Sequence, residues 1–211
     1  MRHAKLSFLF IIGGLFLAAA LMIAHAAEDS FARLRKNAAE IKTIRAAFIQ
    51  TKSMKILAKP LISEGLFFFA APDSFRWEYK KPLRSVVINH RGETKRYIFS
   101  SGKMVEDQSG GVQAMKIVLG EITSWMSGKF DQNPSFQAAL KDKGEIKEII
   151  MTPTAKNMEG MIEKIVITLS SKDKAVRTVN IIESASAQTR IDFKNTLINK
   201  PLPESIFQDV E

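Results

Sequence analysis

Apolar residues recur at two different spacings along the chain, and the spacing changes near residue 48. Before that point the spacing is helical and follows Asp29, a residue type that caps helices well. We therefore expect a first helix whose apolar stripe consists of Phe31, Leu34, Ala38, Ile41 and Ile44.

From residue 48 onward, the apolar residues alternate with polar ones, which is typical of half-buried strands. The clearest case places Phe75, Trp77 and Tyr79 on one face, and Pro82 ends this strand because proline cannot donate to a ladder. His-Arg-Gly and Ser-Ser-Gly read as turns between strands. Strands are expected to open at 48–50 and to cover 65–69, 75–79, 85–89, 94–99, 103–107, 145–151, 162–169, 175–182 and 189–196.

A helical insertion interrupts these strands. One apolar stripe predicts a helix that ends near Gly128 and carries Met115, Val118, Leu119, Ile122, Trp125 and Met126. Pro134 then suits the first position of a shorter helix that runs to Leu140.

The fold class indicated is mainly β (α+β). About ten strands at short spacing favour antiparallel hairpins, because parallel pairs need long crossovers. A sheet of this size curls and presents one apolar concave face, which the helices can cover. Periodicity alone leaves open whether that interior is packed or hollow, since an alternating strand looks the same in both cases.

The first 26 residues have the parts of a secretory signal peptide. Arg2 and Lys5 precede an uncharged apolar run over 6–23, and Ala24-His25-Ala26 follows. We expect cleavage after Ala26, which leaves residues 27–211 as a single domain with a formal charge lowered by two, from +9 to +7. The basic residues are scattered singly, so a nucleic-acid partner is not expected.

Residues that carry chemistry are scarce. The chain has no Cys, and His90 is the only histidine beyond residue 26. A zinc site built from Cys or several His is therefore excluded, and no nucleotide-binding glycine pattern occurs. We read His90 as a solvated turn residue and expect neither an enzyme nor a cofactor.

Three short motifs occur in a fixed order. Phe48-x-Gln50 comes first, then Ser63-x-Gly65-x-Phe67 leading to Pro72, then the run 75–82 with sequence FRWEYKKP. This series resembles the signature region of the outer-membrane lipoprotein carrier family (LolA), and the order of predicted elements matches along nearly the whole mature chain.

The resemblance implies an incomplete antiparallel barrel of about ten to eleven strands under a lid of about three helices. It also implies a monomeric periplasmic carrier that takes acylated lipoproteins from an inner-membrane ABC-type releasing complex to an outer-membrane acceptor. On this view the cavity is lined by Phe67, Phe69, Phe75, Trp77 and Tyr79, and the underside of the lid by Met115, Val118, Leu119, Ile122 and Met126. Phe75→Glu is then expected to block cargo uptake while the protein still folds.

One departure concerns the arginine that latches the lid in typical members. This chain has Ala71 at that position, and Arg76 or Arg84 are the candidates to replace it. The chain also reaches Glu211 soon after Phe207, so the longer C-terminal tail of some members is not expected. Two alternatives stay open: a carrier of another lipid, such as a glycolipid or free acyl lipid, and a lipid-sensing binding module.

Overall fold

The computed structural model describes residues 31–107, 120–144, 146–154, 162–170, 175–208 and 210. Within these residues, eleven antiparallel strands form one sheet in the order β6-β5-β4-β3-β2-β1-β11-β10-β9-β8-β7. The strands are β1 (Thr43–Met54), β2 (Leu61–Ala70), β3 (Ser74–Lys81), β4 (Ser85–His90), β5 (Glu93–Ser100), β6 (Lys103–Glu106), β7 (Phe136–Lys143), β8 (Ile146–Pro153), β9 (Lys164–Ser170), β10 (Val176–Ser184) and β11 (Ala187–Ile198).

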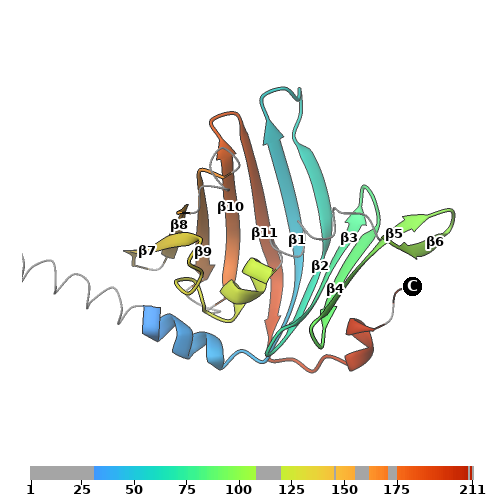
Figure 1. Ribbon diagram of the computed structural model, residues 1–211, viewed down its shortest axis with the longest axis horizontal. Coiled ribbons are helices and arrows are strands. Elements are labelled where there is room, and N and C mark those ends of the chain that lie inside the picture. Colours follow the sequence, from blue (N-terminus) through green and yellow to red (C-terminus); the bar gives the residue numbers. More distant parts are fainter. Residues whose placement is uncertain are drawn as a thin grey trace, which may run out of the picture.

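The sheet is a curved, unclosed wall with β6 at one edge and β7 at the other. Figure 1 shows the helical residues 120–126 lying over its middle strands and the helical residues 31–39 near the lower end of β8 and β9. A short 3-10 helix, η2 (Glu204–Phe207), follows β11 on the other side. The mainly β, incomplete-barrel prediction is confirmed.

The predicted hairpin turns are confirmed by backbone geometry. Arg91 and Gly92 have φ of 51° and 81°, and Ser101 and Gly102 have φ of 52° and 82°. Positive φ at both central residues defines the turn that matches the twist of two antiparallel strands. These tight turns join β4 to β5 and β5 to β6.

The shorter helix predicted over 134–140 is wrong, because this stretch forms β7. Phe136, Ala138 and Leu140 face the core while Gln137 and Ala139 are exposed, a period of two. Full pairing with β8, from Phe136 opposite Pro153 to Lys143 opposite Ile146, overrides the helix propensity of the Ala-Ala-Leu-Lys run. The described residues therefore hold two helical segments over the sheet, fewer than the expected lid of about three.

The first helix is also shorter than predicted. The helical residues end at 39, and Ile44 lies in β1, which starts at Thr43. Ile41, Thr43 and Ile44 are β-branched and fit a pleated surface better than a helix. The predicted cap Asp29 and the predicted signal peptide over 1–26 lie outside the described residues.

Two apolar clusters stabilise the fold, one on each face of the sheet. The larger lies on the concave face, between the sheet and the helical segments. The smaller lies on the outer face, where Phe68, Val86 and Ile88 pack against Phe207 of η2. Among the described residues, no helix is both long and apolar enough to cross a bilayer.

Candidate functional site

Five aromatic side chains meet on the concave face, and we call them the inner aromatic cluster: Phe48, Phe67, Trp77, Tyr79 and Phe193. The ring centroids of Phe48 and Trp77 lie 4.5 Å apart, and those of Phe67 and Trp77 lie 5.3 Å apart. Trp77 is 1% exposed. The register places Phe48 opposite Phe193 and Phe67 opposite Trp77, so neighbouring strands bring these rings together.

The glycine of the second motif makes room for this cluster. Gly65 lies opposite Phe48 in the pairing of β1 with β2. A Cβ at Gly65 would collide with the Glu78 carbonyl oxygen and lie 2.5 Å from Cζ of Phe48. Only glycine therefore lets the Phe48 ring lie across β2.

Gln50, the glutamine of the first motif, forms a hydrogen bond with the hydroxyl of Tyr79 in the cluster. The Tyr79 hydroxyl donates to Oε1 of Gln50 at 2.9 Å. Burial raises the pKa of the Tyr79 hydroxyl above its ordinary value, so Tyr79 stays a neutral donor at physiological pH. This bond gives a buried phenol the partner that it needs.

The structure places all five predicted cavity residues on the concave face. Phe67 and Phe69 are each 1% exposed and Phe75 is 4% exposed, and they pack in the same core as Trp77 and Tyr79. Phe75 is so well buried that Phe75→Glu would place a charge in the core, which makes it a poor test of uptake alone.

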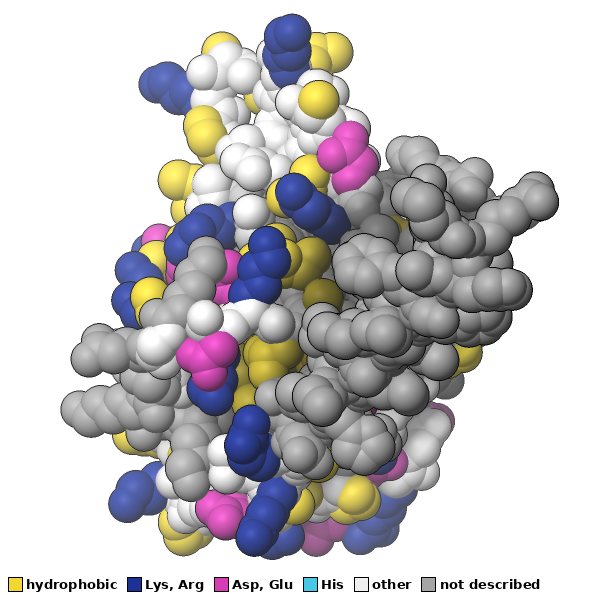
Figure 2. All heavy atoms as spheres, turned by 90° about the vertical axis from the view of Figure 1, so that its left-hand side faces the viewer, with side chains coloured by type: hydrophobic (Ala, Val, Ile, Leu, Met, Phe, Trp, Pro, Cys, Tyr) yellow, Lys and Arg dark blue, Asp and Glu magenta, His cyan; other side chains and the backbone are white. Residues whose placement is uncertain are grey.

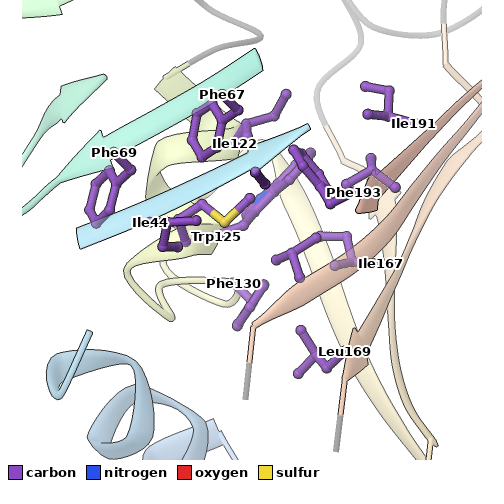
Figure 3. Packing of buried hydrophobic residues seen from close by; sticks show 14 of the residues in the cluster. Ile44, Phe67, Phe69, Ile122, Trp125, Phe130, Ile167, Leu169, Ile191 and Phe193 are labelled. Atoms are coloured by element: carbon purple, nitrogen blue, oxygen red, sulfur yellow. The ribbon is translucent and has the colours of Figure 1, made fainter. Parts of the chain in front are cut away.

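The helical residues 120–126 cover this face with apolar side chains. Ile122, Trp125 and Met126 are 2%, 2% and 4% exposed, and Figure 3 shows Ile122 and Trp125 directed toward Phe67 and Ile44. Two of the predicted lid residues, Ile122 and Met126, thus lie against the core. Met115, Val118 and Leu119 lie outside the described residues.

Beside this packed region is a recess of about 210 Å³. It lies between the two helical segments and the ends of β8 to β10. Its apolar wall consists of Leu34, Ala38, Ile41, Ile44, Trp125, Met126, Phe130, Leu169, Ala175 and Val176. Arg33, Asn37, Lys147 and Ser170 add polar groups to its lining.

The size of the recess limits what it can hold. An engineered cavity of about 150 Å³ accepts benzene, while sites for drug-sized ligands run from about 300 to 1,000 Å³. The recess therefore admits part of an acyl chain and no more unless the cover moves. Trp125 lines it, and its buried Nε1 has no hydrogen-bond partner among the described residues.

The two helical segments are held together around the recess. Gly128 has φ of 76°, and a Cβ there would lie 2.6 Å from Cβ of Ala38, so glycine allows this close approach. Arg35 donates from Nη1 to Asp131 at 2.8 and 2.6 Å.

On the side that carries β7 and β8, Figure 2 shows hydrophobic side chains flanked by Lys and Arg.

Among the described residues, the contacts given for the two candidates for the replacement latch lie away from residues 120–126. Ala71 lies exposed just beyond the end of β2, so the inward face of that strand ends with Phe69. Arg76 is on the outer face, where Nη1 donates to the Ile206 carbonyl oxygen at 3.1 Å. The Arg84 guanidinium lies over the Phe99 ring, 4.8 Å from its centroid.

His90 is not the solvated turn residue that we expected. It ends β4 half-buried, with Nδ1 3.0 Å from Oγ of Ser74 and Nε2 3.3 Å from the Glu204 carboxylate. Its ring stacks on Phe207 at 5.9 Å. Ser74 is 9% exposed, and these contacts attach η2 to the sheet. In the part of the chain that the structure describes, no three His, Asp or Glu residues are placed to hold a metal ion.

The recess was not assigned to the site from sequence. The apolar stripe that includes Leu34, Ala38 and Ile41 was visible as a helix face, but its partners Leu169 and Val176 come from distant strands. The sequence signal that could have indicated the recess was the stripe itself, because an apolar helix face needs another surface to cover it.

Comparisons with known proteins agree with this architecture. Residues 39–209 match the family model described as outer membrane lipoprotein carrier protein LolA. An outer-membrane lipoprotein carrier protein of Methylibium petroleiphilum is 26% identical over 92% of each chain. The protein of the same name from Dechloromonas aromatica is 26% identical over 89% of this chain and 85% of that one.

One solved structure, the MucA/MucB complex of Pseudomonas aeruginosa, aligns with a TM-score of 0.51 at 13% identity. The alignment covers 86% of this chain and 60% of that chain, and it concerns the fold alone. The match over residues 39–209 spans most of the chain and includes every strand described above. The chain therefore belongs to the LolA family of outer membrane lipoprotein carrier proteins.

Proposed function

We propose that this protein carries the acyl chains of lipoproteins through the periplasm, from an inner-membrane ABC-type releasing complex to an outer-membrane acceptor. The observation that carries the proposal is the continuous apolar interior between the concave sheet and residues 120–126, with its recess beside residues 31–39. The family membership supports the carrier role. The proposal includes removal of residues 1–26 as a signal peptide and assigns no catalysis or cofactor.

Binding in this proposal exchanges one set of apolar contacts for another. A long acyl chain gains on the order of 10 kcal/mol on leaving water, at about 0.8 kcal/mol per methylene. Entry displaces Ile122, Trp125 and Met126 from the sheet, and exposing each costs about 1.5–3 kcal/mol. The net free energy of binding is therefore moderate, which suits a carrier that must release its cargo.

The recess is the proposed entry point. It is already open, so the first methylenes can bind before the cover moves. The indole N–H of Trp125, which has no partner among the described residues, offers a donor to an ester or amide carbonyl of the acylated terminus. The inner aromatic cluster and Phe69 and Phe75 then form the wall along which the rest of the chain lies.

A pair of substitutions at one position tests the entry point. Leu34 is only partly buried and lines the recess, so it can be changed without opening the core. Leu34→Trp fills the recess and is expected to weaken uptake of a fluorescent fatty-acid probe about tenfold. Leu34→Ala enlarges the recess and should keep uptake at or above the wild-type level. Equal uptake by both variants, with folding shown by circular dichroism, would contradict this entry point.

The cargo is identified by mass spectrometry of the protein isolated from its own host. Acylated lipoproteins in stoichiometric amount support the proposal. A defined glycolipid or free acyl lipid would instead make this chain a carrier or sensor of that lipid. An empty protein that also takes up no probe would end the carrier proposal.

A further inference from the structure

One end of the sheet gathers exposed apolar side chains. In an antiparallel meander every second turn lies at the same end, so the β1–β2, β3–β4 and β5–β6 turns share one end. We call it the hairpin end. Its exposed fractions are high: Ile56 86%, Leu83 79%, Ile62 56%, Leu61 55% and Phe99 44%.

The β1–β2 hairpin extends farthest at this end, as Figure 1 shows. Pairing between β2 and β3 stops at Glu64 opposite Lys81, so Leu61 and Ile62 lie beyond the last pair with β3. The tip has a defined shape, because the Leu57 amide donates to the Met54 carbonyl oxygen at 2.9 Å. The exposed apolar side chains of the tip therefore lie beyond the last β2–β3 pair, next to an ordered turn.

The charge of this hairpin has one sign. No Asp or Glu occurs between Glu40 and Glu64, whereas this stretch contains Lys42, Arg45, Lys52, Lys55 and Lys59. Lys55 and Lys59 are exposed and flank Ile56 in the turn region. Lys52, farther from the tip, pairs with Glu183 at 3.2 Å. The tip itself thus combines exposed Ile and Leu with lysine.

Single exposed apolar residues are ordinary on protein surfaces, but a group of them at one end marks an interaction site. Lysines beside apolar side chains, without acidic neighbours, match the surface of an anionic bilayer. The ammonium groups are attracted to the headgroups, and the apolar side chains insert at the acyl boundary. An apolar protein partner would not account for the uniform positive charge.

We propose that the hairpin end, led by the β1–β2 tip, docks this protein on a membrane surface rich in anionic lipid. The docking is independent of cargo uptake, because the recess lies at the opposite end of the sheet, beside residues 31–39, the end of β9 and the start of β10. The inference therefore concerns the surface to which the protein binds, and it goes beyond the identity of the cargo.

Flotation with vesicles tests the proposal. The protein is expressed with its whole sequence and taken from the soluble fraction, so that any processing of residues 1–26 has occurred. We expect binding to vesicles of phosphatidylglycerol and phosphatidylcholine in equal amounts, and little binding to phosphatidylcholine alone. Ile56→Ser with Leu61→Ser should weaken binding about tenfold. Lys55→Glu with Lys59→Glu should weaken it at least as much, and added salt should weaken wild-type binding.

Matched controls lie at the other end of the sheet. Leu197 is 46% exposed near the end of β11, and Lys200 follows it. Leu197→Ser and Lys200→Glu should leave flotation unchanged, and all variants should keep wild-type uptake of the fatty-acid probe. Equal loss in the control variants, or equal binding to both kinds of vesicle, overturns the proposal. So does a wild-type dimer in sedimentation that Ile56→Ser abolishes while vesicles are not bound.

Discussion

Strands β2 to β4 carry an apolar cluster on each face, and the two clusters are covered in different ways. On the outer face, residues 200–208 are fixed by polar contacts: Arg76 to the Ile206 carbonyl oxygen, and Arg91 to Glu204 at 2.6 Å. On the concave face, Ile122, Trp125 and Met126 contact the sheet through apolar surface.

This difference indicates which of the two covering segments a ligand can displace from the sheet. Hydrogen bonds have preferred directions and ion pairs need an opposite charge, so an apolar ligand that displaces the outer cover cannot replace them. Apolar contacts are non-directional and scale with buried area, so an acyl chain can replace those of the inner cover. The proposed function therefore requires the inner face to open, while the outer face is expected to stay closed.

The largest expected effect comes from removing the buried ion pair of the outer face. It tests whether polar contacts fix the segment that covers this face. Arg76 Nε donates to Glu78 at 3.0 Å, with side chains 11% and 9% exposed, and Lys80 also pairs with Glu78. Glu78→Ala leaves Arg76 without this partner in a buried place. The free energy of unfolding should fall by about 3–5 kcal/mol in chemical denaturation.

Glu64→Ala is the matched control. Its carboxylate pairs with Lys81 at 3.6 Å, and both side chains are at least half exposed. The loss there should stay within about 0.5 kcal/mol. Similar losses for the two variants would show that the outer pair has no special structural role.

The second prediction concerns the inner cover, the helical residues 120–126 on the concave face, and tests whether it controls ligand binding. Met126→Ala should lower the free energy of unfolding by about 2 kcal/mol and tighten binding of the fatty-acid probe about fivefold, because a weaker cover opens more easily. Ile88→Ala removes similar volume from the outer cluster. It should cost a similar stability and leave probe binding unchanged, as fluorescence titration can measure. Tighter binding in both variants would show that the covers are not distinct.

The smallest expected effect concerns pH. Burial alone would raise the pKa of Glu78, but hydrogen bonds and charges from Lys80 and Arg76 outweigh it and hold the pKa below its ordinary value of 4.5. A depressed folded-state pKa adds stability above the unfolded value that is lost as pH falls through the folded one. Unfolding midpoints should therefore drop below about pH 4.5, and the drop should be shallower in Glu78→Gln. An identical acid dependence in that variant would assign the effect to other carboxylates, such as Asp192 beside Arg190.

The strands were predictable because their signals are local. Alternation of Phe75, Trp77 and Tyr79 with Arg76 and Glu78 determines which side chains face inward, and Arg91-Gly92 and Ser101-Gly102 determine the turns. The prediction failed at β7, where local helix propensity and the period-two pattern of Phe136, Ala138 and Leu140 disagree. Pairing with β8 decides between them, and pairing is not a local property.

The site was predictable only in part for the same reason. Strand periodicity places Phe75, Trp77 and Tyr79 on one face, whereas the inward direction of Phe67 and Phe69 was implied by the family resemblance. The recess depends on a gap between residues 31–39 and the ends of β8 to β10, which only the folded chain brings together. The outer cover was missed because Ile206 and Phe207 stand in a short C-terminal segment. Nothing local in the sequence pairs this segment with the apolar even-numbered face of β2 and β4.

The strand order has a consequence for how the molecule forms. β1 to β6 are neighbours in chain order, as are β7 to β11, and among the described strands the β1–β11 pair joins the two halves of the sheet. Each half can assemble from short hairpins at small entropic cost, whereas the seam that sets Phe48 opposite Phe193 must close a loop of most of the chain. Nucleation should thus be local in each half, and joining at the seam should limit the folding rate and complete the aromatic interior in one late step.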